Sequence, residues 1–147
     1  MGDRAGDGPR WRVPSGRRPY TVAVPEVRLP GPRSYPGLDG PEHARRLLRR
    51  AENPDRPGAG TLRRLSSSRG YGIERMPELP WALDQRIWCS VYEHAFLLDD
   101  ESVLCLYELE HDFTPGRRLV CEVYSDEPAA CEAARRHARA FGGAGMR

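Results

Sequence analysis

The chain has 147 residues, about the size of one domain, and its formal net charge is only +2. This small charge argues against a dedicated DNA-binding protein. All 23 basic residues are arginines, which is the composition that a GC-rich coding sequence produces. No signal segment opens the chain, and no apolar run approaches the roughly 20 residues that span a bilayer. We therefore expect a cytoplasmic protein that does not bind membranes and whose four cysteines are reduced thiols.

Residues 1–40 are rich in Arg, Pro and Gly and poor in apolar side chains. Such a segment cannot bury enough surface to offset the entropy lost on ordering, so we expect a disordered or docking arm. One part alternates as an extended strand does, from Tyr20 to Val24 and on to Val27 and Leu29. The prolines around it would confine that strand to a sheet edge or to an arm docked on the domain.

A helix is expected to open a single domain that spans residues 41–142. Asp39 or Gly40 can cap this helix, Pro41 suits its first turn, and Pro54 ends it. Spacings of three and four residues predict an apolar stripe of Ala44, Leu47, Leu48 and Ala51, and leave the other faces to Arg45, Arg46, Arg49 and Arg50.

A second, shorter helix is expected from Thr61, where it would bury Leu62 and Leu65. The run of three serines that follows, together with Gly70 and Gly72, predicts a loop that leads to the next part of the domain.

Three strands that fold back on one another are predicted between Arg86 and Phe141. Asp99–Glu101 supplies turn residues for the first hairpin, and Thr114–Gly116 supplies them for the second. Antiparallel strands that pair about these turn centres alternate their side chains between two faces. One face is apolar apart from Glu93 and must be the core side, with Cys89, Val91, Ala95, Leu97, Val103, Cys105, Tyr107, Leu109, Leu119, Cys121 and Val123.

The last helix is expected near Pro128, with Ser125 or Asp126 as its cap, and to end at Gly142 and Gly143. Its buried stripe would consist of Cys131, Ala134, Ala138 and Phe141, and residues 143–147 would form a tail. The predicted fold class is α+β: a three-stranded antiparallel meander packed with N-terminal helices and a C-terminal helix, preceded by a disordered Pro/Gly/Arg-rich N-terminal arm.

The other face of the meander mixes aromatic and acidic side chains, and it carries the candidate partner-binding residues Trp88, Tyr92, Phe96, Glu108, Glu110, Glu122 and Tyr124. In this register Glu108 lies opposite Glu122, and opposed like charges destabilise a strand pair. Two explanations stay open. The arginine-rich arm could cover the face, or the face could bind a basic or apolar partner, because an exposed aromatic patch with a polar rim marks an interaction site.

No residue pattern predicts catalysis, a cofactor or a metal site. Cys89, Cys105 and Cys121 are evenly spaced, but the register staggers them along the sheet, whereas zinc needs its ligands around one point. Cys89 opposite His111 is the one nucleophile–base pair to consider, and a buried thiol beside a core histidine is the interpretation that we favour. The sequence offers no metal-like partner for the other histidines, which are His43, His94 and His137.

Nucleic-acid binding is the alternative function. Arg45, Arg46, Arg49 and Arg50 could form a basic surface that contacts phosphates. The small net charge, the GC-rich origin of the arginines and the lack of a recognisable helix-turn-helix argue against it.

A string of 34 residues, HAFLLDDESVLCLYELEHDFTPGRRLVCEVYSDE from His94 to Glu127, carries a family resemblance. Its marks are Leu97-Leu98, Ser102, Glu108-Leu109-x-His111, Pro115-Gly116, Glu122-Val123-Tyr124 and Asp126-Glu127. It resembles the central block of domain of unknown function 6227, an uncharacterised family of small proteins from high-GC actinobacteria, and residues 43–51 resemble the first helix of that family. Glu101 stands where the family usually has Gly. The family implies no activity, substrate or catalytic residue.

The favoured function is therefore a non-catalytic protein-interaction or regulatory module with an unidentified protein partner. A nucleic-acid-associated protein is the alternative, and a small enzyme is the least favoured hypothesis.

Overall fold

A computed structural model describes residues 26–28, 34–77 and 88–145 of the chain. The strand expected at residues 20–24 and Leu29 lie outside the described residues. Val27 belongs to β1 (Glu26–Arg28), which pairs antiparallel with the first residues of β4 (Val103–His111). The described part of the expected arm thus extends the edge of the sheet.

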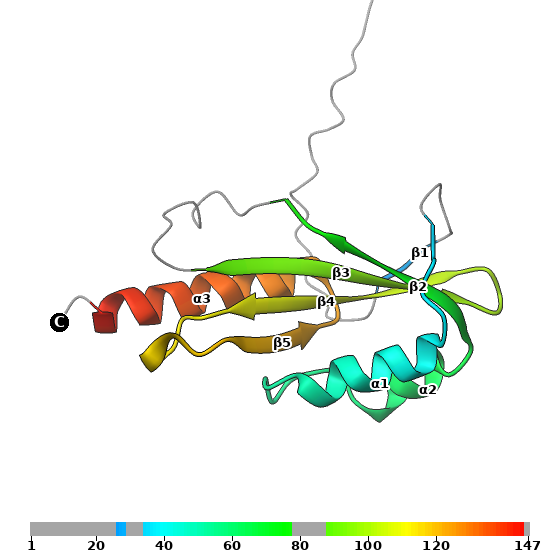
Figure 1. The fold of residues 1–147 in the computed structure, drawn as a ribbon, viewed down its shortest axis with the longest axis horizontal. Helices are drawn as coiled ribbons and strands as arrows, with labels where there is room; N and C mark the ends of the chain where they lie inside the picture. The colour runs from blue at the N-terminus through cyan, green and yellow to red at the C-terminus, as the bar shows by residue number, and fades with distance from the viewer. Residues whose placement is uncertain (1–25, 29–33, 78–87, 146–147) are drawn as a thin grey trace, which may run out of the picture.

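Five strands form one antiparallel sheet, more than the three expected (Figure 1). Besides β1 and β4, they are β2 (Ser68–Arg75), β3 (Cys89–Leu98) and β5 (Val120–Tyr124). The strand order is β1-β4-β3-β2. Strand β5 pairs with the same edge of β4 as β1 does, with residues 107–111 of β4, whereas β1 pairs with residues 103–105. The central pair, β3 and β4, lies in the expected register, with Cys89 opposite His111 and Ala95 opposite Cys105.

Strand β2 replaces the loop that was expected at the serine run, Gly70 and Gly72, so that prediction was wrong. Both glycines lie where residues 34–37 cross the strand. A Cβ added at Gly72 would meet the carbonyl oxygen of Ser34 at 2.8 Å, and one at Gly70 would meet that of Tyr35 at 3.0 Å. Glycine within a strand often marks a place where another backbone approaches closely, and residues 34–37 make that approach here.

The two N-terminal helices form where they were expected. In α1 (Gly40–Arg50), Asp39 Oδ1 accepts the amide hydrogen of Glu42 at 3.1 Å and caps the helix. Helix α2 (Ala59–Leu65) buries Leu65 and leaves Leu62 partly buried.

The C-terminal helix α3 (Glu127–Gly145) is capped by Asp126, whose Oδ1 accepts the amide hydrogen of Ala129 at 2.8 Å. Its fully buried stripe consists of Ala130, Ala133 and Ala134, whereas Cys131, Ala138 and Phe141 are half-buried. Three small side chains let the helix axis lie close to the sheet. No helix in the described part of the chain is long and apolar enough to span a membrane.

Helices cover both faces of the sheet (Figure 1). This corrects the expectation that one face is the core side and that the other is covered by the N-terminal arm or binds a partner. Helix α3 packs on Val91, Ala95, Val103, Cys105, Tyr107 and Leu109. Helices α1 and α2 pack on the opposite face, where the buried residues are Phe96, Leu98, Leu104, Leu106 and Val123. We call these faces the α3 side and the α1 side.

The register between β4 and β5 differs by one residue from the predicted one. Leu109 lies opposite Glu122, and Glu108 lies opposite Val123. The pairing is centred between Pro115 and Gly116, in a loop whose 3-10 turn (Pro115–Arg117) has left-handed backbone at Gly116 (φ 83°) and Arg117 (φ 58°). Because the side chains of a strand alternate, this shift exchanges the two faces of β5 and removes the opposed carboxylates.

Glu101, in the first hairpin turn, also has left-handed backbone, with φ 73°. Its amide hydrogen bonds to the carbonyl oxygen of Leu98 at 3.0 Å, and Asp100 Oδ1 accepts the amide hydrogen of Ser102 at 3.0 Å. A glycine adopts this conformation without strain. The backbone at Glu101 therefore suits the Gly that is expected at this position from the family resemblance.

Candidate functional site

The α1 side of the sheet holds a buried chain of two histidines and a carboxylate. His94 on β3 and Glu108 on β4 lie on the same face, and α1 brings His43 against them. His94 Nε2 lies 2.7 Å from Glu108 Oε1, and His43 Nε2 lies 2.9 Å from His94 Nδ1. An ionised carboxylate only accepts, so His94 Nε2 donates to Glu108, and the ring nitrogens of His94 and His43 share a hydrogen bond. We call His43, His94 and Glu108 the α1-side cluster.

Several groups hold Glu108 in its ionised form. Burial alone would raise its pKa, but hydrogen bonds from His94 and Glu110 outweigh burial and lower the pKa to about 2. Arg50 Nη2 lies 3.2 Å from Glu108 Oε2, and the Cys121 thiol donates to the same oxygen at 3.2 Å. Glu108 is therefore a saturated acceptor inside the fold.

Two further titratable groups on this side, His43 and Cys121, are held in their neutral forms. Burial, followed by the charge of His94, lowers the pKa of His43 to about 4, and the ring of His43 stacks on Tyr71 with centroids 3.8 Å apart. Burial and then Glu108 raise the pKa of the Cys121 thiol well above its usual value. A protonated thiol is a poor nucleophile, so the arrangement favours structural hydrogen bonding over attack on a substrate.

Glu110 marks the outer end of this side. It is half-buried, and burial, followed by its hydrogen bond and repulsion with Glu108, raises its pKa to about 7. Two carboxyls in contact cannot both ionise at low cost, so this pair carries one negative charge below about pH 7 and gains the second above it.

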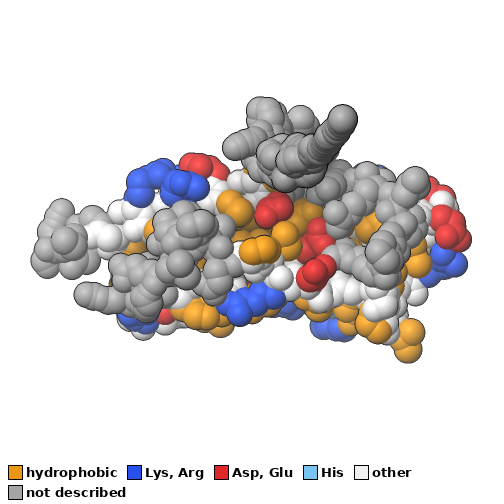
Figure 2. Space-filling model, turned by 90° about the horizontal axis from the view of Figure 1, so that it is seen from above, with side chains coloured by type: hydrophobic (Ala, Val, Ile, Leu, Met, Phe, Trp, Pro, Cys, Tyr) orange, Lys and Arg blue, Asp and Glu red, His pale blue; other side chains and the backbone are white. Residues whose placement is uncertain are grey.

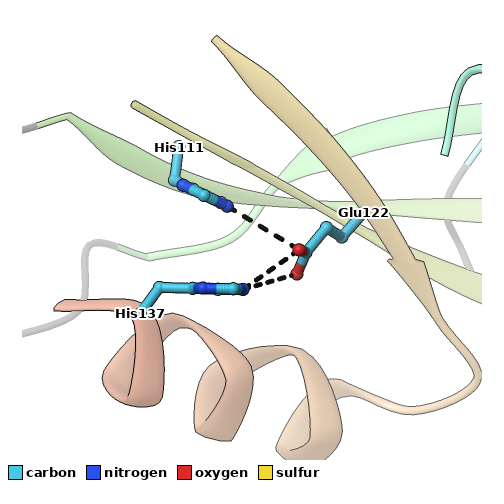
Figure 3. Close-up of side chains that lie close together, drawn as sticks. All are labelled: His111, Glu122 and His137. Atoms are coloured by element: carbon cyan, nitrogen blue, oxygen red, sulfur yellow. Dashed lines mark hydrogen bonds and ion pairs between the residues drawn. The ribbon is translucent and has the colours of Figure 1, made fainter. Parts of the chain in front are cut away.

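The α3 side holds a second cluster, formed by His111 on β4, Glu122 on β5 and His137 on α3 (Figure 3). His137 Nε2 lies 3.0 Å from both carboxylate oxygens of Glu122, and His111 Nε2 lies 3.9 Å from Glu122 Oε2. The hydroxyl of Tyr124 donates to Glu122 Oε1 at 2.7 Å. We call His111, Glu122 and His137 the α3-side cluster.

Hydrogen bonds and charge decide the state of this carboxylate too. Burial would raise the pKa of Glu122, but His111, Tyr124 and His137 outweigh burial and lower it to about 2. Burial, followed by the bond to Glu122, raises the pKa of Tyr124 well above its usual value. His111 differs from its neighbours: its Nδ1 accepts the amide hydrogen of Phe113 at 3.1 Å, but its buried Nε2 has no hydrogen-bond partner among the described residues.

The histidines are therefore the site residues that sequence reasoning missed. The expectation that His43, His94 and His137 lack partners was wrong, because each lies within 3.0 Å of a histidine or a carboxylate. For His94 a signal existed, since alternation along β3 and β4 places it on the face of Glu108, diagonally across the strand pair. For His137 no such signal existed, because only packing of α3 brings it to Glu122.

The seven candidate partner-binding residues do not share one exposed face. Four are buried, namely Phe96, Glu108, Glu122 and Tyr124, and the last two lie on the α3 side because of the register shift. Trp88, Tyr92 and Glu110 are partly or largely exposed and lie together near the start of β3 and the end of β4. The premise of a single aromatic–acidic surface was thus wrong, and a smaller group of three residues is left.

The four candidate nucleic-acid residues also separate. Arg50 turns inward to Glu108, whereas Arg45, Arg46 and Arg49 are exposed on α1 and lie 3.0 to 3.9 Å from the single carboxylate of Glu42. On the face viewed from above, Figure 2 shows hydrophobic and acidic side chains near the middle, with arginines around them. In Figure 1 helix α1 lies on the lower side of the molecule, so this view from above is not of the α1 arginines.

The described cysteines lie on both sides of the sheet. Cys89 and Cys105 pack on the α3 side, and Cys121 packs on the α1 side. A shallow cavity of about 310 Å³ lies elsewhere, between residues 34–36 and the end of β2, and is lined by Ser34, Pro36, Gly72, Ile73 and Glu74. Within residues 26–28, 34–77 and 88–145, the group of donors that could hold a metal ion is the α3-side cluster.

Fold and sites together define the class: an antiparallel sheet between helical layers, with a buried histidine–carboxylate cluster on each face. The chain belongs to the Family of unknown function (DUF6227), whose family model matches residues 11–141. No curated protein and no solved structure matches the chain.

Proposed function

We propose that this protein is a small cytoplasmic, non-catalytic interaction module, and that its protein partner binds at Trp88, Tyr92 and Glu110. These residues lie at one end of the α1 side, beyond Glu108. Two features support the rest of the proposal. All four cysteines are free thiols, as in proteins of a reducing compartment, and burial together with Glu108 holds the Cys121 thiol protonated.

The observation that carries the proposal is the position of Glu110. This half-buried carboxyl contacts the ionised Glu108 and lies opposite Ser90, so alternation along β3 places Trp88 and Tyr92 on the same face and diagonal to it. A positively charged group of a partner would relieve the repulsion between the two carboxyls. Trp88, which is 38% exposed, and Tyr92 would contact the alkyl part of that group and its apolar neighbours. The partner is therefore expected to present arginine or lysine next to apolar side chains.

Glu108 has a supporting role in this proposal. It is buried and bonded to His94, Arg50 and Cys121, so it fixes the negative potential beneath Glu110 without touching the partner. Phe96, Glu122 and Tyr124 lie inside the fold and take no direct part.

The test is affinity capture followed by titration of the captured protein. Wild type is compared with Trp88→Ala/Tyr92→Ala and with Glu110→Gln, and with Leu119→Ser as a control, because Leu119 is 56% exposed and lies outside the three-residue group. Loss of at least about tenfold in affinity in the first two variants, with the control unchanged, is expected for residues central to an interface. Equal affinity of all four proteins, or weakening that merely follows a loss of thermal stability, would refute the proposal.

Nucleic-acid binding is the second candidate, and the exposed arginines of α1 are its support. Arg46→Ala/Arg49→Ala should then reduce the slope of the logarithm of affinity against the logarithm of salt concentration by about 2. Mobility shifts with an unchanged slope would exclude these arginines as phosphate contacts.

A further inference from the structure

We propose that His111, Glu122 and His137 form a binding site for one divalent first-row transition-metal ion, of which zinc is the representative. This site is separate from the proposed partner-binding residues. It uses three elements that are distant in sequence, β4, β5 and α3, and it lies on the opposite face of the sheet (Figure 3).

The geometry brings three donor atoms around one point. His111 Nε2, a carboxylate oxygen of Glu122 and His137 Nε2 all lie within 4.8 Å of one another. Metal–ligand bonds of about 2.0–2.2 Å in a tetrahedral zinc site place neighbouring donors about 3.3–3.5 Å apart. The separations of 3.0 Å from His137 and 3.9 Å from His111 to Glu122 lie on either side of that range. The outer limit of 4.8 Å exceeds that range by about 1.3 Å, so the donors must draw together, by a tilt of the two rings, to meet a common ion.

An independent observation points to a missing occupant. Of the buried side-chain nitrogen and oxygen atoms in the described part of the chain, His111 Nε2 alone has no hydrogen-bond partner, and this side chain is only 2% exposed. Figure 3 shows this nitrogen directed toward Glu122, as is that of His137. A buried polar atom without a partner is destabilising, so a group that fills the space between the three side chains would stabilise the fold.

The donor set selects the class of ion. Two imidazole nitrogens and one carboxylate suit zinc, iron(II) and related first-row metals, whereas calcium and magnesium prefer oxygen ligands throughout. Three protein ligands leave a fourth position for a water molecule. That position would open near His137, whose side chain is 33% exposed.

The surroundings hold the carboxylate in place. Tyr124 donates to Glu122 Oε1 and so leaves Oε2, the oxygen nearer to His111, for an ion. Hydrogen bonds of this kind orient the ligands of metal sites.

Binding must also change two local interactions. His111 Nδ1 accepts the amide hydrogen of Phe113, so the hydrogen of the neutral ring sits on Nε2 in the metal-free state. An ion at Nε2 moves that hydrogen to Nδ1 and breaks the bond to Phe113. The His111 and His137 rings, stacked at 4.5 Å and 24° apart, must tilt so that their lone pairs converge. His137 can supply this movement because it is the most exposed of the three ligands.

An ion here would fasten the second half of α3 to the sheet. The buried alanine stripe ends at Ala134, and beyond it His137 provides a polar contact between α3 and β5. Metal occupancy would thus set how firmly the end of this helix is docked.

The experiment is a zinc titration of the full chain by calorimetry, with metal content measured after dialysis and cobalt(II) used as a spectroscopic substitute. One ion per chain is expected, with the visible absorption of a four-coordinate cobalt site. His137→Gln and Glu122→Gln should weaken zinc binding at least about 100-fold, and Tyr124→Phe about tenfold, because the first two remove ligands and the third removes a ligand's hydrogen bond. In the amide NMR spectrum, the Phe113 resonance should move on saturation with zinc.

Two control variants show whether the site is the one proposed. His43→Gln removes a histidine of the α1-side cluster, and Cys131→Ser removes a half-buried thiol; both should bind zinc as wild type does. His137 is partly exposed, so His137→Gln is expected to fold and keeps the test decisive. Absence of saturable binding, or wild-type affinity in His137→Gln, overturns the proposal and leaves a water molecule as the occupant. An unmoved Phe113 resonance overturns the assignment of His111 as a ligand.

Discussion

The α1-side and α3-side clusters are built from the same residue types on opposite faces of β4, yet they differ in completeness. In the α1-side cluster, Glu108 accepts from His94, Arg50 and Cys121, and His43 continues the chain of hydrogen bonds. In the α3-side cluster, His111 Nε2 has no hydrogen-bond partner among the described residues. A closed network stabilises a fold, whereas an open one leaves room for a ligand.

The comparison also separates two ways of burying a charge. Arg50 compensates Glu108 with a permanent positive charge, whereas Glu122 depends on histidines and a tyrosine. Replacing the carboxylate of the α1-side cluster by an amide should therefore destabilise the fold more than the same replacement in the α3-side cluster.

The largest effect is expected from Glu108→Gln, which removes the charge beside Arg50 and the strong acceptor of His94. The free energy of unfolding should fall by about 2–3 kcal/mol, because the buried ring of His94 loses its charged acceptor, and hydrogen bonds to charged groups contribute about 1.5–3 kcal/mol. Glu122→Gln, the matched change on the other face, should lower it by about 1–2 kcal/mol. Urea denaturation of both variants measures the difference. Equal losses would contradict the distinction between the clusters.

The next effect is on the pH dependence of stability and is tested by His43→Phe. The folded pKa of His43 is about 4, below its ordinary value of 6.5, so the unfolded chain binds the extra proton first as the pH falls. Stability due to His43 is thus present above about pH 6.5 and is lost toward pH 4, by about 2–3 kcal/mol.

Two carboxyls of the same network also titrate. Glu108, with a folded pKa of about 2, loses its contribution to stability only below pH 4.5. Glu110, with a folded pKa of about 7, makes the fold more stable as the pH falls from 7 to 4.5. The measurement is therefore the difference between wild type and His43→Phe from pH 4.5 to 6.5, which should shrink as the pH falls. A constant difference over this range would show that His43 does not titrate as described.

A smaller effect is expected from Tyr124→Phe, which deletes the hydroxyl that donates to Glu122 Oε1 and keeps the ring. Thermal or urea unfolding should show a loss of about 1 kcal/mol, the usual contribution of one such hydrogen bond. Tyr71→Phe is a suitable control, because the stacking of Tyr71 on His43 is kept by the phenyl ring. A loss in Tyr124→Phe no greater than in this control would show that the hydroxyl does not hold Glu122.

The smallest effects separate the arginines of α1. Arg50→Gln should lower stability by about 0.5–1 kcal/mol, discounted because the side chain of Arg50 is 46% exposed. Arg49→Gln should change it by less than about 0.5 kcal/mol, since its contact with Glu42 is long and exposed. If the two variants were indistinguishable by urea unfolding, Arg50 would not belong to the α1-side network.

Local sequence signals predicted much of this fold. Pro41 after Asp39 and the stripe from Ala44 to Leu48 located α1, and alternation located β3 and β4 in their observed register. Ser125 or Asp126 was expected as the cap of α3, and the structure selects Asp126, whose side chain acts on an amide only three residues away. These features depend on neighbours in the chain, and such neighbours are visible in the sequence.

Other features were decided only by tertiary packing. Left-handed backbone at Gly116 and Arg117 moves the centre of one hairpin by half a residue, and that shift sends Glu122 and Tyr124 to the α3 side. Gly70 and Gly72 were taken for a loop because the chain that crosses them lies more than thirty residues earlier in the sequence. The sequence alone thus determined the helices, the central hairpin and the α+β class. The pairing of carboxylates with helix side chains depended on which faces the helices cover. His137 reaches Glu122, 15 residues away, because α3 packs on the sheet, and Arg50 reaches Glu108, 58 residues away, because α1 packs on the other face.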